Sequence, residues 1–166
     1  MEFMQGVNQK ETLEITQLLD EALLGQTVKV NGAVHTIRDM GDVAFVVLRK
    51  REGLLQCVYE EGVTEFNIKD LKEASTIEVE GVVAKEDRAP NGFEIRIKDV
   101  KVLSVPAAPM PLAVNKWKLN TSLEANLNYR SLSLRNVRER AKFRIQEGVT
   151  RAFRDYLYSE GFTEIH

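Results

Sequence analysis

The segment from Arg38 to Tyr59 constrains the fold of this chain more than any other. A polar turn that contains Gly41 leads into the apolar run Val43 to Leu48, and a charged turn that ends at Gly53 leads into a second run, Leu54 to Tyr59. Two short apolar runs joined by a glycine-containing polar turn are typical of a β-hairpin. The chain must therefore accommodate at least one antiparallel pair of strands.

Three further strands are predicted around this hairpin. Thr27 to Val34 alternates apolar and polar residues before it, and Ile77 to Val83 and Phe93 to Ile97 alternate after it. A short helix is predicted over Ile68 to Ala74, with Asn67 as its N-cap. The order β-β-β-α-β-β is that of an OB-fold, a five-stranded Greek-key barrel whose second and third strands commonly face oligonucleotides. We therefore predict a mainly β fold.

Helices are predicted on either side of the barrel. Apolar spacing over Leu13 to Leu24 indicates an amphipathic helix that Gly25 ends. The same spacing indicates a long helix from Asn136 to Glu160, with Asn136 as its N-cap and Gly161 as its end. Pro106, Pro109 and Pro111 indicate a semi-rigid, extended linker between barrel and long helix. The predicted organisation is an N-terminal helical extension at 1–25, an OB-fold domain at 26–104, a linker or hinge at 105–128, and the start of a further domain at 129–166.

Composition excludes several classes of protein. Of 166 residues, Cys57 is the only cysteine and His35 and His166 are the only histidines, so a disulfide framework and a zinc site are not expected. No apolar run approaches the ~18 residues of a membrane helix, and the first residues, Met1 to Gly6, lack the pattern of a signal peptide. We expect a cytoplasmic protein with no membrane partner.

Phe45, Gln56 and Glu94 are the candidate ligand-binding side chains. An aromatic ring and a side-chain amide on one hairpin can stack on and hydrogen-bond an unstacked RNA base, and a carboxylate can accept from a base amino group. The sequence also leaves open roles without ligand contact, because a Phe in a Val-rich strand is often part of a core and a strand Gln or Glu is often a solvated surface residue. Residues 38 to 52 hold four basic and three acidic side chains, a balance that favours recognition at one site over coating of a long single strand.

The long helix predicted near the C-terminus is apolar on one face and basic on the other. Between Tyr129 and Arg154, eight Lys and Arg residues accompany two Glu residues, a local net charge of +6. Both solubility and a contact with phosphate or an acidic partner explain the basic face. Val149, Phe153 and Leu157 lie in the apolar stripe, which is expected to belong to a core or a subunit interface.

Several motifs together resemble one family. They are Val-His-Thr-Ile-Arg-Asp-Met-Gly (34–41), Phe-Val-Val-Leu-Arg-Lys-Arg-Glu-Gly-Leu-Leu-Gln (45–56), Asn-Gly-Phe-Glu-Ile (91–95), Asn-Tyr-Arg-Ser-Leu-Ser-Leu-Arg-Asn (128–136), and the segment 143–166. From about Gly25 to its last residue the chain is similar to the N-terminal part of class II aminoacyl-tRNA synthetases of the aspartyl/asparaginyl/lysyl subgroup. It is most similar to the aspartyl-tRNA synthetases of the archaeal and eukaryotic type.

The resemblance implies roles for matching residues in anticodon recognition. In this family the OB-fold binds the tRNA anticodon: the Phe that matches Phe45 stacks on its central uridine, the Gln that matches Gln56 hydrogen-bonds that uridine, and the Glu that matches Glu94 contacts the neighbouring base. Arg38, Arg49 and Arg51 are then candidates for contacts with the RNA backbone.

The resemblance also implies an enzyme larger than this chain. The long helix resembles motif 1 of class II enzymes, so Val149, Phe153 and Leu157 are expected at the interface of a homodimer. The full enzyme would activate aspartate with ATP and Mg²⁺ and transfer it to tRNA.

Departures from the family pattern limit the expected activity. The sequence stops short of the proline that closes motif 1 and contains nothing that resembles motifs 2 and 3. We therefore expect this chain to be an N-terminal fragment that holds no cofactor and is inactive in aminoacylation by itself. Many aspartyl enzymes carry Trp at the position of Ala33, so strict selectivity for tRNA(Asp) is not implied. An asparaginyl enzyme, or one that charges both tRNA(Asp) and tRNA(Asn), stays open. A non-catalytic OB-fold module that binds nucleic acid or protein is the alternative from a different class.

Overall fold

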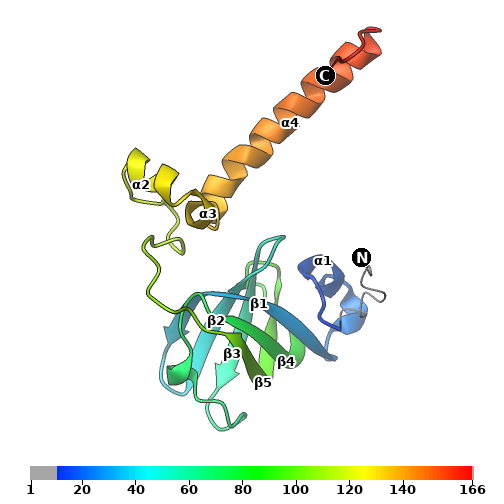
Figure 1. The fold of residues 1–166 in the computed structure, drawn as a ribbon. Helices are drawn as coiled ribbons and strands as arrows, with labels where there is room; N and C mark the ends of the chain where they lie inside the picture. The colour runs from blue at the N-terminus through cyan, green and yellow to red at the C-terminus, as the bar shows by residue number, and fades with distance from the viewer. Residues whose placement is uncertain (1–10, 166) are drawn as a thin grey trace, which may run out of the picture. The chain divides into compact units, whose positions relative to one another are not determined.

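The computed structural model describes residues 11–165, which form one unit up to Met110 and a second unit from Pro111 (Figure 1). The predicted lack of a signal peptide at Met1 to Gly6 and the last matched residue, His166, lie outside the described residues. Within 11–165, no helix has both the length and the apolar composition that crossing a membrane requires.

Five strands close into a barrel in the first unit. They are β1 (Thr27–Asp39), β2 (Val43–Arg49), β3 (Leu54–Glu60), β4 (Thr76–Lys85) and β5 (Phe93–Ser104). Their order around the barrel is β1-β2-β3-β5-β4, and every neighbouring pair is antiparallel except β3 with β5. The prediction of a mainly β, five-stranded OB-fold is confirmed.

Strand β1 is longer than the prediction, which ended it at Val34. The register with β2 shifts between Val34 and Thr36, so His35 lies in a β-bulge. A bulge inserts one residue and reverses which face the following side chains occupy, so the apolar alternation is interrupted although the strand continues to Asp39.

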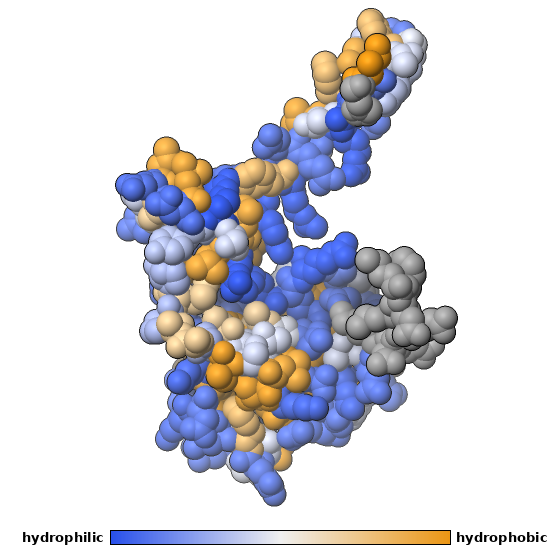
Figure 2. All heavy atoms as spheres, in the orientation of Figure 1, coloured by the Kyte–Doolittle hydropathy of each residue, from blue (hydrophilic) through white to orange (hydrophobic). Residues whose placement is uncertain are grey.

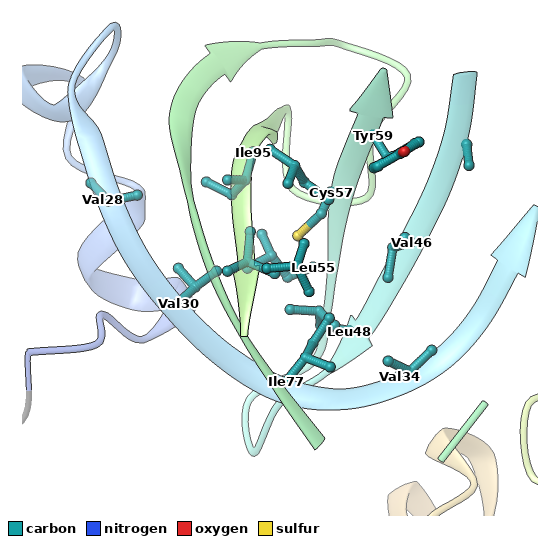
Figure 3. Close-up of a cluster of buried hydrophobic side chains, with 14 of the residues drawn as sticks. Val28, Val30, Val34, Val46, Leu48, Leu55, Cys57, Tyr59, Ile77 and Ile95 are labelled. Carbon is teal, nitrogen blue, oxygen red and sulfur yellow. The ribbon is translucent and has the colours of Figure 1, made fainter. Parts of the chain in front are cut away.

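Alternating side chains fill the barrel (Figure 3). Val30, Val46, Leu55, Cys57 and Ile77 are fully buried and come from four strands, and Figure 3 shows them pointing toward one another. The close approach of β4 to β5 requires a glycine, since a Cβ at Gly81 would overlap the carbonyl oxygen of Arg96. Packing of the inner set leaves the alternate residues of each strand on the outer face.

The N-terminal segment is not the single helix predicted over Leu13 to Leu24. It forms a short α-helix, α1 (Ile15–Leu18), and a 3₁₀ turn, η1 (Glu21–Leu23), because the Asp20 carboxylate accepts from the backbone N–H of Ala22 and starts a new turn. Ile15 and Leu18 join the barrel core. The segment therefore packs as part of the barrel.

Polar contacts fasten this segment to the turn between β2 and β3. The Thr16 N–H and hydroxyl donate to the Glu52 carboxylate at 3.1 and 3.2 Å. The Lys50 side chain is 2% exposed, lies 3.3 Å from the Glu14 carboxylate and donates to the Asn31 carbonyl at 2.9 Å. These contacts fix the end of the hairpin.

The predicted helix over Ile68 to Ala74 is only a 3₁₀ turn, η2 (Ile68–Asp70). Asn67 is its N-cap as predicted, since its side chain accepts from the Lys69 N–H at 3.0 Å. The helix does not extend because its C-cap, Leu71, already has an extended backbone, with a φ of −79° and a ψ of 132°.

The second unit contains α2 (Leu123–Asn128), α3 (Arg130–Ser133) and α4 (Val137–Ser159). α2 lies inside the segment predicted as linker and was not predicted. The long helix is confirmed with the expected N-cap, because the Asn136 side chain accepts from the N–H groups of Arg138 and Glu139. Gly161, with a φ of 83°, ends it in a Schellman motif, in which the Phe162 N–H donates to the Leu157 carbonyl and the Gly161 N–H to the Tyr158 carbonyl.

Candidate nucleic-acid interface

Two rows of outward-facing side chains cross the barrel. In the first row, β-sheet pairing places Arg38 beside Phe45, Phe45 beside Val58 and Val58 beside Arg96. In the second row, Thr36 lies beside Val47 and Val47 beside Gln56. Strands β1, β2, β3 and β5 thus present one continuous outer face.

Phe45 belongs to this face and not to the core. Its neighbours Ala44 and Val46 are fully buried inside the barrel, so Phe45 points outward and remains half-buried. A ring that is supported on one side and open on the other can receive a flat ligand. Of the roles that the sequence left open for Phe45, membership of the core does not fit this geometry.

Gln56 and Glu94 are hydrogen-bonded to each other although 38 positions separate them. The Gln56 Nε2 donates to the Glu94 Oε2 at 3.0 Å, across the parallel pairing in which Cys57 faces Ile95. The Glu94 side chain is only 8% exposed, so it is not a freely solvated surface carboxylate. The sequence predicted both residues as candidates, and the structure brings them into one site.

This hydrogen bond sets the orientation of the Gln56 amide. A carboxylate is an acceptor only, so the amide nitrogen must point toward Glu94 and the amide oxygen must point away from it. Within residues 11–165, no hydrogen bond to that oxygen is present. Gln56 therefore offers an acceptor to a ligand on the outer face.

The predicted backbone-binding arginines lie around the same face. Arg38 is exposed and is the cross-strand neighbour of Phe45, Arg49 ends β2 and is half-buried, and Arg51 is exposed in the β2–β3 turn. The structure adds Arg96, which was not predicted. Its Nε lies 3.9 Å from the Glu94 Oε1 and its side chain is 64% exposed. Its place two residues after Glu94 on the same strand was the signal that could have identified it.

The β1 bulge holds a buried histidine. His35 is 8% exposed, and its burial, followed by the positive charge of Arg49, lowers its pKa, while Glu73 opposes the shift. Neutral imidazole is therefore the favoured form near neutral pH.

A hollow next to the β1–β2 turn is acidic. It is lined by Asp39, Asp42, Glu61 and Glu65 among others. Like charge repels phosphate, so this hollow does not suit a nucleic-acid backbone. Within residues 11–165, no group of His, Cys, Asp and Glu side chains is arranged to hold a metal ion.

The residues predicted at a subunit interface lie on α4. Val149 is 66% and Phe153 is 63% exposed, and Figure 2 shows apolar side chains in orange interspersed with polar ones in blue along this helix. Leu157 is half-buried and lines a hollow with Phe162 of the C-terminal turn. Two of the three are thus available for contact, and the interface itself stays a prediction.

Comparisons with known proteins agree with the barrel and extend past it. Residues 28–103 match the family described as "OB-fold nucleic acid binding domain". The chain is 42% identical over 141 residues to an aspartate–tRNA(Asp/Asn) ligase of Deinococcus radiodurans, a match that covers 85% of this chain and 31% of the relative. It is 36% identical over 152 residues to an aspartate–tRNA(Asp) ligase of Pyrococcus horikoshii, covering 89% of this chain and 34% of the relative.

A solved structure gives the same result for the fold. The crystal structure of asparaginyl-tRNA synthetase from Pyrococcus horikoshii superposes with a TM-score of 0.75 at 28% identity, over 90% of this chain and 36% of that one. The chain spans about a third of the length of the curated relatives it matches. These matches confirm the resemblance predicted from the sequence motifs.

Proposed function

We propose that the outer barrel face binds the anticodon loop of a tRNA, and the match of residues 28–103 to the OB-fold nucleic acid binding domain family supports this proposal. One observation carries the proposal. The hydrogen bond between Gln56 and Glu94 lies one cross-strand row away from the outward ring of Phe45. A stacking platform and an oriented amide on one face are what recognition of a splayed RNA base requires.

Phe45 provides the stacking surface in this proposal. Base–aromatic stacking contributes about 1–3 kcal/mol per base and depends little on which base is stacked. Arg38 and Arg96 lie in the same row and place positive charge on either side of the bound nucleotide. Phe45 therefore supplies affinity, and another group must supply discrimination.

Gln56 provides the discrimination between pyrimidines. Its amide oxygen accepts from the N3–H of uracil, whereas N3 of cytosine carries a lone pair and would face that oxygen without a hydrogen. A buried acceptor left without a donor costs about 1–3 kcal/mol. The proposed site therefore prefers uridine over cytidine at the position of this base.

Glu94 contributes twice. One carboxylate oxygen holds the Gln56 amide at 3.0 Å, and the other faces Arg96. The second oxygen is also a candidate acceptor for an exocyclic amino group of the neighbouring base. Arg49 and Arg51, near the β2–β3 turn, are proposed to contact backbone phosphates, which position the RNA without reading its sequence.

The activity of the whole protein is a further part of this proposal. The names of the relatives support a ligase that joins aspartate to tRNA(Asp), or to both tRNA(Asp) and tRNA(Asn). We propose in addition that this ligase is cytoplasmic and uses ATP and Mg²⁺ bound outside the residues of this chain. Val149, Phe153 and Leu157 are proposed to lie at its homodimer interface. The role of the present chain is to recognise the anticodon.

Stacking by Phe45 is tested by binding of an anticodon stem-loop with U at its central position. Phe45→Ala is expected to weaken binding by about 1–3 kcal/mol, as measured by fluorescence anisotropy. Phe162→Ala removes an exposed ring from the second unit and is the matched control, expected to bind as the unsubstituted chain does. Equal affinity for Phe45→Ala and the control would refute the placement of the base on Phe45.

A further inference from the structure

Charge is divided unevenly between the two units. The first, up to Met110, carries 13 Lys and Arg against 19 Asp and Glu, a net charge of −6, and the second carries 10 against 6, a net charge of +4. The attraction of a protein for RNA phosphates comes from its basic residues and sets the salt dependence of binding. The barrel unit alone is poorly suited to supply it.

A short loop in the second unit presents an exposed tryptophan between two lysines. Trp117 is the only tryptophan in the chain and is 78% exposed, and Lys116 and Lys118 beside it are also exposed. An exposed ring of this size offers a flat apolar face on which a base can stack.

The loop is held in place by the residue that starts α4. Asn136 is 2% exposed, and its Nδ2 donates to the carbonyls of Val114 and Lys116 at 3.0 and 2.7 Å while its Oδ1 caps the helix. The Arg138 guanidinium, from the second residue of α4, lies 5.7 Å from the centre of the Trp117 ring. The tryptophan is therefore fixed beside a positive charge.

A second pair of the same kind lies near the first turns of α4. The Arg130 guanidinium lies 4.8 Å from the centre of the Phe143 ring, and Phe143 is 43% exposed. The nearby Glu139 carboxylate forms an ion pair with Lys142 at 2.6 Å and also interacts with Arg130. Aromatic rings interleaved with basic groups are the composition of surfaces that bind nucleic acids through phosphates and stacking.

We infer that this surface, named here the Trp117 surface and made of Lys116, Trp117, Lys118, Arg130, Arg138 and Phe143, is a second RNA-binding site. It contacts backbone phosphates and stacks Trp117 on an exposed base or ribose. The inference rests on the proposed function, since it takes RNA as the ligand of the chain. Its effect is distinct from base discrimination by the barrel face: the Trp117 surface adds salt-dependent affinity to that of the phosphate contacts proposed for Arg49 and Arg51.

The test compares the unsubstituted chain with Lys116→Ala/Lys118→Ala, using a labelled anticodon stem-loop at several salt concentrations. The double variant is expected to reduce the slope of log affinity against log salt by about 2, one for each lost phosphate contact, and to leave the preference for U over C unchanged. Lys69→Ala/Lys72→Ala removes the same charge from the barrel unit and is the matched control, expected to keep the slope. Fluorescence of Trp117 is expected to fall on RNA binding, in Phe45→Ala as in the unsubstituted chain.

Three other outcomes would overturn the inference, and the measurements distinguish them from one another. An unchanged slope and unchanged Trp117 fluorescence, with the U preference retained, would remove the Trp117 surface from RNA binding and leave the proposed function standing. A shift in sedimentation of the double variant, without a change in slope, would assign the surface to contact between copies of the chain. Absence of RNA binding by the unsubstituted chain would overturn both proposals together.

Discussion

Replacing Glu94 by Ala tests whether the carboxylate sets the direction of the Gln56 amide. In the unsubstituted chain, turning the amide over would break the 3.0 Å hydrogen bond and place two oxygens against each other. A hydrogen bond to a charged group is worth about 1.5–3 kcal/mol, so the turned amide is rare. Without Glu94 the amide is free to turn and donate to N3 of cytosine. The ratio of affinities for U and C is therefore expected to fall by about 10- to 100-fold.

The assay is fluorescence anisotropy with two anticodon stem-loops that differ only in U or C at the central position. The ratio is the informative quantity, because loss of a contact between Glu94 and a neighbouring base would weaken both complexes equally. Arg96→Ala is the control, since it removes a group 3.9 Å from the same carboxylate without changing the partner of Gln56. A ratio that survives Glu94→Ala would refute the claim that Glu94 orients the amide.

Three further predictions concern the barrel itself. Leu18→Ala is expected to lower the free energy of unfolding by about 2–5 kcal/mol in chemical denaturation, because Leu18 is 2% exposed in the core. Leu19 is 58% exposed, so Leu19→Ala should change the free energy of unfolding by less than about 0.5 kcal/mol. Equal effects of the two substitutions would show that the N-terminal segment does not pack on the barrel. Burial raises the pKa of the Cys57 thiol, so Cys57 should resist thiol reagents at pH 8 until the chain is unfolded, and rapid labelling of the folded chain would contradict this burial. Burial lowers the pKa of His35 in the folded chain below its value in the unfolded chain. Neutral His35 therefore contributes its full stabilisation above a pH of about 6.5, and this contribution is lost as the pH falls below that value. His35→Gln should flatten the decline of stability between pH 7 and pH 5, and an unchanged decline would show that other groups cause it.

The sequence was informative wherever short-range pattern determines the structure. Alternation identified β1, β4 and β5, and apolar runs joined by a turn identified β2 and β3. The caps at Asn67 and Asn136 were found because a capping side chain acts on backbone groups two or three residues away. Gly161 was found as a helix end for the same local reason.

The predictions were wrong where contacts between residues far apart in the sequence determine the local structure. The bulge at His35 reverses the alternation of β1, so periodicity could not follow the strand to Asp39. The N-terminal helix was overestimated because Ile15 and Leu18 are positioned by the barrel core and not by helix propensity.

In the candidate site, too, local sequence identified some features and contacts distant in sequence determined the others. Chemistry alone selected Phe45, Gln56 and Glu94, but their outward direction and the hydrogen bond across 38 positions follow from strand pairing. Arg96 was missed because its importance comes from its place in that pairing, beside Val58 and near Glu94.

The most direct test of the account is the affinity of this chain for anticodon stem-loops with U or C at the central position, measured at two salt concentrations. A site that combines stacking on Phe45 with the oriented acceptor of Gln56 predicts a preference for U of about tenfold or more, from a penalty of about 1–3 kcal/mol for the unpaired acceptor, at both salt concentrations. Equal affinities for U and C, set by salt alone, would contradict anticodon recognition by the barrel and favour a general nucleic-acid or protein interaction module.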